Sequence, residues 1–473
     1  MVLSQFKADC CQPTRMREAL VISRTLWLRY AGRVRAIGVA AAMDIGEQTQ
    51  GGGTVAAHAA AEPGHRGQAA GRLVAQFLVV LALAAAIAVA LLGWARSGLP
   101  GLEAPDRYFY DLRHVWLARS PATARPELAV VSLTDRSIAG YPAIQPIDRG
   151  LLARLVTELT VGGARVIGLD LRFDRATEPA KDAALAAAIR AAGGRVVVGV
   201  IDARSGAPEN ALAFQREFLA LAGNPRTGHL YFDRKKQGFG QPDLAVRFIA
   251  RRTGNSAEVQ TSFGEALLEA FGATVHDVGQ SVVAKNGEVG PHIAWLAPKA
   301  ADGSDTFTRI EVPPSAAGSA TEPLIPKPLQ AVLADRIVIV GGAFQDFDRH
   351  LTPFSAWDGA RMTAAEVHAH ITAQLKDGRR LTGLEWRQEA VLLGAIAFVG
   401  LVLGYRRRMQ GGLGDYALLT IILVLVGGAA FSLYGVILPS DTMFYAALAS
   451  IVIGHNGLRW TRSILRGRMP RVR

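Results

Sequence analysis

The chain contains short runs that are apolar at almost every position, separated by segments whose apolar residues recur every three or four positions. Three of these runs, residues 128–133, 164–169 and 195–200, each end at or near an aspartate. Strands of this composition are usually covered on both faces, as in a parallel sheet. The segment after Asp148 carries one apolar stripe and residues 181–192 are rich in alanine, so both are predicted to be helices. This order predicts a βαβαβ unit with right-handed crossovers.

Later parts of the chain extend this unit. Residues 336–340 form a fourth apolar run, and residues 363–375 have the pattern of a helix that closes the domain. The stretch between, residues 205–330, is less regular. It is predicted to contain a helix at 259–271 and strands at 292–296 and 306–312. We therefore predict an α/β domain over residues 103–385, doubly wound, with a mainly parallel sheet and an insertion.

Four longer apolar segments lie outside this domain. An uncharged run at residues 73–94 is long enough to cross a hydrocarbon core of about 30 Å. Three more follow the domain, at residues 388–405, 416–438 and 442–458. We expect four transmembrane helices. Residues 1–72 are predicted to be a disordered cytoplasmic segment, and the sequence leaves open whether translation starts at Met1 or at Met43.

The basic residues indicate the orientation of these segments. The net charge is +12, and arginines cluster at residues 406–408 and in the tail 459–473, beside apolar segments. This placement is typical of the cytoplasmic flanks of membrane helices, so no nucleic-acid partner is expected. It places both termini in the cytoplasm and the domain outside. Four basic residues on the proposed outer side oppose this arrangement: Lys376, Arg379, Arg380 and Arg387. The only cysteines are Cys10 and Cys11, so the domain carries no disulfide.

Acidic residues follow the predicted strands at their carboxyl ends, and arginines lie beside several of them. In an open α/β sheet, ligands bind beyond the carboxyl ends of the strands, so we expect these side chains to line one cleft. The candidate ligand-binding residues are Asp135, Arg136, Arg149, Asp170, Arg172, Asp202 and Asp348. Carboxylates there can hold a divalent cation or bind hydroxyl and amine groups of a polar ligand. The alternative is that the aspartates belong to turns and pair with neighbouring arginines.

No metal site, cofactor or catalytic residue is predicted. His350 lies two positions after Asp348 and is a candidate metal ligand, but a loop histidine more commonly makes a structural hydrogen bond. Glu366 and His370 are four apart on a predicted helix, where they can share a ligand or form a solvated face. The sequence lacks a Walker-type phosphate loop, a G-x-S-x-G nucleophile elbow and a paired C-x-x-C.

The order of one apolar segment, an α/β domain and three further apolar segments resembles CHASE2 proteins, which are bacterial transmembrane sensors. The motifs that carry this likeness are Tyr110-Asp111-Leu112-Arg113, residues 131–137, Arg149, residues 163–170, Asp182, residues 337–341, Asp348, Thr352-Pro353 and residues 366–369. The likeness covers about residues 103–460. It departs from the family at residues 232–247, which lack the usual Asp-x-Asp-Gly-x-x-Arg stretch, and at Ala365, where glycine is frequent.

The resemblance implies a periplasmic domain that senses an extracytoplasmic signal, in a multi-pass protein of the inner membrane. Family members commonly carry a cyclase, a diguanylate cyclase or a kinase, and this sequence contains no such module. The resemblance therefore implies a sensor without its own output domain, which signals through a separate cytoplasmic cyclase, kinase or regulator.

The expected partners are an unknown small ligand outside and the lipid bilayer, and a homodimer is left open. The protein is not expected to be an enzyme. The alternative is a metal-dependent ectoenzyme that uses the aspartates at the strand ends. A transporter component is disfavoured, because the apolar segments are few and, apart from Glu389 and His455 near their ends, carry no acidic or basic residues.

Overall fold

The computed structural model describes residues 63–97, 103–141, 145–201, 205–232, 244–250, 261–279, 282–284, 287–314, 322–345, 348–406 and 412–465. The predictions for residues 1–62, for the end of the basic tail and for Asp202 lie outside this part of the chain.

The helices are α3 (Pro63–Ser97), α4 (Glu103–Leu117), α5 (Arg149–Val161), α6 (Pro179–Ala191), α7 (Glu209–Leu221), α8 (Phe263–Phe271), α10 (Lys327–Leu333), α11 (Ser355–Asp358), α12 (Ala364–Asp377), α13 (Trp386–Arg406), α14 (Gly412–Tyr434) and α15 (Ser440–Leu465). The strands are β1 (Leu128–Leu133), β2 (Val166–Asp170), β3 (Val196–Val200), β4 (Arg226–His229), β5 (Val282–Ala284), β6 (Gly287–Val289), β7 (Thr308–Glu311), β8 (Ile337–Gly342), β9 (Arg349–His350), β10 (Met362–Thr363), β11 (Thr382–Gly383) and β12 (Val436–Ile437).

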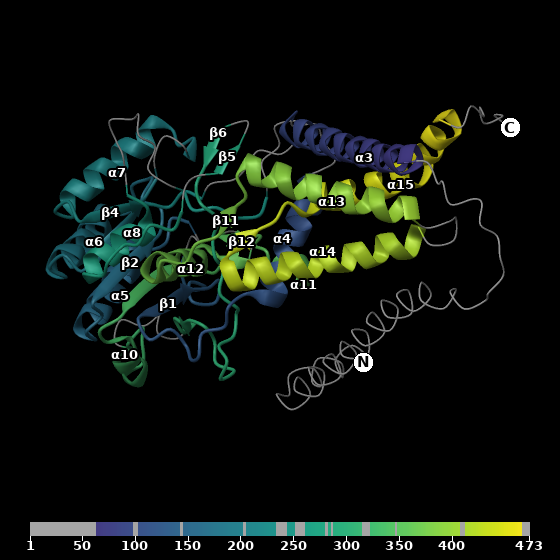
Figure 1. Cartoon of the computed structure of the whole chain (residues 1–473). Coiled ribbons are helices and arrows are strands. Elements are labelled where there is room, and N and C mark those ends of the chain that lie inside the picture. The colour runs from purple at the N-terminus through teal and green to yellow at the C-terminus, as the bar shows by residue number, and fades with distance from the viewer. Residues whose placement is uncertain are drawn as a thin grey trace, which may run out of the picture. The chain divides into compact units, whose positions relative to one another are not determined.

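Six strands of the described chain form a parallel sheet in the order β4-β3-β2-β8-β1-β7. Figure 1 labels β4, β2 and β1 of this sheet. β8 pairs with β1 on one side, where Leu128 lies opposite Ile337, and with β2 on the other, where Asp170 lies opposite Gly341. The last strand of the sheet in sequence therefore lies between the first two. The predicted α/β architecture with a mainly parallel sheet is confirmed.

The sheet is buried on both faces, because successive side chains of a strand point to opposite sides. Val131 and Val340 face the core under α5, α6 and α7, and Phe218 of α7 is part of that core. Val130 and Ile339 face the opposite core, under α8 and α12. This two-sided burial is the physical reason for the continuous apolar runs in the sequence.

Polar caps fix where the helices next to the strand ends begin. The Asp148 carboxylate accepts a hydrogen bond of 2.9 Å from the Leu151 backbone N–H at the start of α5. In α12, Thr363 and Glu366 form a reciprocal capping box. The Ala364 backbone N–H, in the same turn, donates to the Asp348 carbonyl oxygen over 3.1 Å. The first turn of α12 is thus held against the loop that follows β8.

The predicted strand at residues 292–296 is wrong. These residues form only single bridges with two different partners, Phe248 and Arg119. Side chains of α12 take their backbone donors instead: the Gln374 amide oxygen accepts from the Ala294 N–H over 2.7 Å. The Leu296 N–H likewise donates to His370 Nδ1, so the segment forms no continuous ladder with another strand. The neighbouring helix prediction is also too long, because α8 begins at Phe263 after its N-cap, Ser262.

Within the residues that the structure describes, three helices are long and apolar enough to cross a membrane, at Val74–Ala95, Trp386–Tyr405 and Tyr416–Tyr434. α14 ends at Tyr434 rather than at residue 438, because Gly435 adopts a left-handed φ of 65° and the next two residues pair with β11. α15 covers the fourth apolar segment and begins at Ser440.

α13 and α15 pack closely because small residues line their contact. A Cβ atom at Gly400 would collide with the Ser450 hydroxyl, and one at Gly404 with the Ile451 carbonyl oxygen. On the facing helix, a Cβ atom at Gly454 would lie 2.5 Å from the Leu401 carbonyl oxygen. Small residues four apart on both helices are the usual means by which membrane helices bring their backbones together.

Candidate functional site

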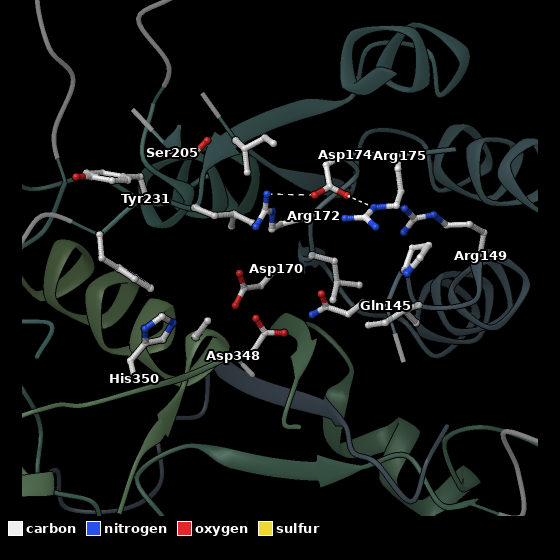
Figure 2. Close-up of a pocket in the computed structure, with 17 residues that line it drawn as sticks. Gln145, Arg149, Asp170, Arg172, Asp174, Arg175, Ser205, Tyr231, Asp348 and His350 are labelled. Atoms are coloured by element: carbon white, nitrogen blue, oxygen red, sulfur yellow. Dashed lines mark hydrogen bonds and ion pairs between the residues drawn. The ribbon is translucent and has the colours of Figure 1, made fainter. Parts of the chain in front are cut away.

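A cavity of about 450 Å³ opens at the carboxyl ends of the strands (Figure 2). Its walls come from the end of β2, the loop that follows it, the loop after β8, the loop before α5 and the first residue of α12. This is where an open parallel sheet binds ligands. The volume lies within the range of small-molecule sites.

Asp170 and Asp348 face each other in the middle of the cavity (Figure 2). Asp170 ends β2 and is only 8% exposed, and its Oδ2 has no hydrogen-bond partner among the described residues. Asp348 has a left-handed φ of 58°. Neither carboxylate forms an ion pair with a lysine or arginine of the described chain.

Two glycines at the end of β8 make room for these carboxylates. A Cβ atom at Gly341 would lie 2.8 Å from the Ala365 Cβ and 3.4 Å from Oδ2 of Asp170. A Cβ atom at Gly342 would lie 2.6 Å from Oδ2 of Asp348. A side chain at position 342 would displace Asp348, and one at position 341 would collide with the first turn of α12 beside Asp170.

Burial raises the pKa values of both acids. The pKa of Asp170 lies well above its usual 3.8, first because the carboxyl is buried and then because of the negative charge of Asp348. Burial also raises the pKa of Asp348, an effect that the positive charge of Arg172 opposes. Both carboxyls therefore favour a bound proton or a nearby cation.

His368 of α12 lies behind Asp170, with Nε2 3.8 Å from Oδ1. Its ring packs between Phe232 and Phe263. Burial lowers the pKa of His368 to about 3, and the positive charges of His229 and His350 add to this effect. The imidazole is therefore neutral at neutral pH, and it does not supply the positive charge that an ion pair with Asp170 would need.

The arginines of the cavity are paired with acids other than these two. Arg172 and Arg175 both contact Asp174, at 3.1 and 3.3 Å, and lie on either side of it in Figure 2. Arg149 is 1% exposed, and its guanidinium lies 4.5 Å from the Phe173 ring centre. Its Nε is 3.5 Å from an oxygen of Asp182.

Four of the predicted residues line the cavity: Arg149, Asp170, Arg172 and Asp348. Asp135 and Arg136 do not. The Asp135 carboxylate accepts a hydrogen bond of 2.9 Å from the Gln345 N–H, and Arg136 is exposed at 3.8 Å from Glu311. Both follow β1, which β8 separates from β2, so they stand outside the cavity. Asp202 lies outside the described residues. Whether the cavity residues bind a ligand remains a prediction.

Several residues of the cavity wall were not predicted from the sequence. Gln145, Ser205 and Tyr231 line it and were not candidates. Their positions in the sequence could have identified them, since each lies in a loop that follows one of the parallel strands. His350, considered as a metal ligand or as a loop histidine with a structural hydrogen bond, is also part of the wall.

Glu366 and His370 do not form a shared site or a solvated face. Glu366 is occupied by the capping box and by Arg309, at 2.9 Å. His370 is buried against the rings of Trp295 and Phe307. Both residues therefore contribute to the fold.

Among the residues that the structure describes, no group of three or more histidine, cysteine or acidic side chains is arranged to hold a metal ion. The metal-dependent ectoenzyme alternative therefore stays a prediction without a described ligand set.

Comparison with known proteins identifies a family. The family described as "CHASE2 domain" matches residues 82–404. No curated protein and no solved structure matches the chain. CHASE2 domains are sensory extracellular domains and not catalytic ones. The match begins within α3 and ends within α13, so it includes the whole α/β domain. Because it covers more than half of the sequence, the chain belongs to the CHASE2 family, and the resemblance seen in its motifs is confirmed.

Proposed function

We propose that this protein is a membrane-anchored sensor whose CHASE2 domain lies outside the cytoplasm, binds a small ligand in the cavity and signals to a separate cytoplasmic partner. The observation that carries the proposal is the state of Asp170. It lines the cavity, is buried, and has an oxygen without a hydrogen-bond partner among the described residues. Folded proteins rarely leave such a group unsatisfied, which supports a ligand as the missing partner.

In this proposal α15 is a fourth membrane helix, the protein lies in the inner membrane, and both termini are cytoplasmic. The close packing of α15 on α13, a candidate span, supports this arrangement. The connection between α14 and α15 also lies at the domain, because Val436 of β12 pairs with Thr382 of β11. Because the α14–α15 connection pairs with the segment that leaves the domain, the two are favoured to lie on the same side of the membrane.

The basic residues that oppose this orientation are used by the folded domain. Lys376 pairs with Glu127 at 3.0 Å, and Arg380 donates to the Asp277 carbonyl oxygen over 2.9 Å. Arg379 is paired with Asp377 at 3.1 Å. Large domains cross membranes largely regardless of their charge, so these residues carry little weight against the arginines of the short loop and the tail.

A chain of contacts supports a route from the cavity to the membrane helices. Leu351, three residues after Asp348, accepts a hydrogen bond of 2.8 Å from the Val246 N–H. The next residue, Arg247, donates to Asp111 of α4 through Nε at 3.0 Å and Nη2 at 2.7 Å.

Two residues after Asp111 in α4, Arg113 donates to the Leu438 carbonyl oxygen over 3.1 Å and to the Ser440 hydroxyl. Helix α4 therefore contacts both the ligand-binding domain and the start of α15. We propose that a shift of the loop after β8 reaches the membrane helices through α4.

Cysteine labelling tests the orientation directly. Cys10 and Cys11 are replaced by serine, and one cysteine is introduced by Arg136→Cys in the domain or by Gln410→Cys in the short loop. Arg136 suits the experiment because its side chain is 81% exposed. A membrane-impermeant maleimide added to intact spheroplasts is expected to label the first variant, and the second only after lysis. The opposite pattern would contradict the proposed orientation.

Affinity capture tests the output. The full chain and a chain that lacks residues 459–473 are purified from the same cells, and the proteins that accompany them are compared. We expect a cyclase, kinase or regulator with the full chain that is lost with the tail. Identical sets of accompanying proteins would exclude the tail as the site of output.

A further inference from the structure

The charges around the cavity are unevenly paired. Two carboxylates in its centre, Asp170 and Asp348, form no ion pair with a lysine or arginine in the described part of the chain, and His368 behind them is neutral. On the adjoining wall, Arg172 and Arg175 share the single carboxylate of Asp174. The cavity thus has an excess of negative charge in the centre and an excess of positive charge on the wall.

Resting on the function proposed above, we infer that the cavity binds a small zwitterion of the amino-acid class, with its ammonium group between Asp170 and Asp348 and its carboxylate toward Arg172. An ammonium group has three N–H donors, enough to satisfy both acids, including the unpartnered Oδ2 of Asp170. A guanidinium on the rim binds a carboxylate through paired N–H donors.

Other classes of ligand match the charges less well. A divalent cation would leave the excess positive charge of Arg172 and Arg175 over Asp174 unbalanced, and the described residues hold no group of three metal-binding side chains. A dicarboxylate would bring further negative charge to two acids that already repel each other. A plain amine would use the acids and not the arginines. Of these ligands, only the zwitterion matches both the two acids and the two arginines.

The elevated pKa values of the two acids agree with this ligand. A cation held between them stabilises the ionised carboxylates, so binding should release protons when the acids are protonated beforehand. The other titratable or charged groups that the structure describes in the cavity wall are Arg149, Arg172, Asp174, Arg175, Tyr231 and His350, with His368 and His229 behind Asp170.

Isothermal titration of the full chain in lipid nanodiscs tests the inference. The probes are the L-α-amino acids, matched amines without a carboxylate, matched acids without an amine, and magnesium chloride; serine, ethanolamine and 3-hydroxypropanoate form one such set. We expect at least one amino acid to bind and its matched fragments to bind much more weakly. Asp170→Asn and Arg172→Gln should each weaken binding about 10- to 100-fold, as expected for lost hydrogen bonds to charged groups.

Asp135→Asn is the matched control, because this aspartate also follows a sheet strand but lies outside the cavity, and it should leave the affinity unchanged. Equal binding of the amine and the amino acid would overturn the inference, and so would binding of magnesium or a dicarboxylate in their place. Failure of every amino acid to bind would also overturn it. None of these results bears on orientation or output, which the labelling and capture experiments decide independently.

Discussion

Replacing Asp170 by asparagine should make the protein more stable at neutral pH. The two side chains have nearly the same size, so the substitution removes a charge without opening a cavity. Asp170 is 8% exposed, its Oδ2 has no hydrogen-bond partner in the described chain, and its Oδ1 lies 3.8 Å from Nε2 of the neutral His368. An ionised carboxylate in this position is a cost to folding that the native sequence retains.

The sign of the pH dependence follows from the raised pKa. The folded protein holds the Asp170 proton more tightly than the unfolded chain, whose pKa is near 3.8. The contribution of this group to stability is therefore fully present below that pKa and is lost as the pH rises through the folded pKa. Asparagine does not titrate, so the variant should keep its stability over the range in which the wild type loses it.

The expected gain is about 1–3 kcal/mol, because the neutral amide also lacks a partner but costs less to bury than an ionised carboxylate. For a domain of this size, each kcal/mol corresponds to a rise in Tm of about 2–4 °C. The assay is intrinsic-fluorescence melting of the full chain in nanodiscs, without ligand, from pH 4 to pH 8. Asp135→Asn serves as the control, because Asp135 is exposed and should show no gain.

Two results would refute this reasoning. A lower Tm for Asp170→Asn at pH 7 would mean that the carboxylate has a stabilising partner. An equal gain at pH 4 and pH 7 would mean that the gain does not come from removal of a titrating group.

Three further substitutions test the packing and the route to the membrane. Asp111→Ala should lower the free energy of unfolding by about 3–5 kcal/mol, because it leaves the buried guanidinium of Arg247 without its main partner. Adding Arg247→Met should recover part of the loss in a double-mutant cycle. Additive losses would contradict a coupled pair. Gly341→Val should abolish ligand binding and cost about 1–3 kcal/mol, since its Cβ would already lie 2.8 Å from the Ala365 Cβ; titration and melting of the same sample check both effects, and unchanged binding would show that the floor of the cavity yields. Gly404→Leu should separate α13 from α15 and lower the Tm, whereas Gly394→Leu on the same helix, where a Cβ meets nothing within 4 Å, should not; equal Tm values for the two variants would contradict the close packing.

The central strands could be predicted closely because their composition reflects burial on both faces. β1 occupies the predicted residues 128–133, and β2 and β3 each begin within two residues of the predicted start. β4 was missed because it lies at the edge of the sheet and its sequence, Arg-Thr-Gly-His, has no apolar run. Helix α4 was missed because its apolar residues are mixed with charged residues that contact other parts of the fold.

The candidate site was predicted in part for a different reason. The sequence shows which residues follow strands, but it does not show which strands are neighbours. β8 lies between β1 and β2, so the ends of those two strands are about 10 Å apart, two strand spacings. Asp348, which follows β8, therefore reaches Asp170, whereas Asp135 meets the loop at Gln345. Strand order depends on tertiary contacts between distant segments, which local patterns do not encode.

The position of β8 also has a consequence for biogenesis. β8, the strand that joins β1 to β2, is synthesised after both, so Leu128 has no pairing partner until Ile337 has been made. Contacts between such distant residues form slowly. Until then, two apolar edges stay open in the growing chain. We therefore expect truncations before Ile337 to be degraded. In the orientation proposed above, we also expect the export machinery or a periplasmic chaperone to shield the first strands until the centre of the sheet arrives.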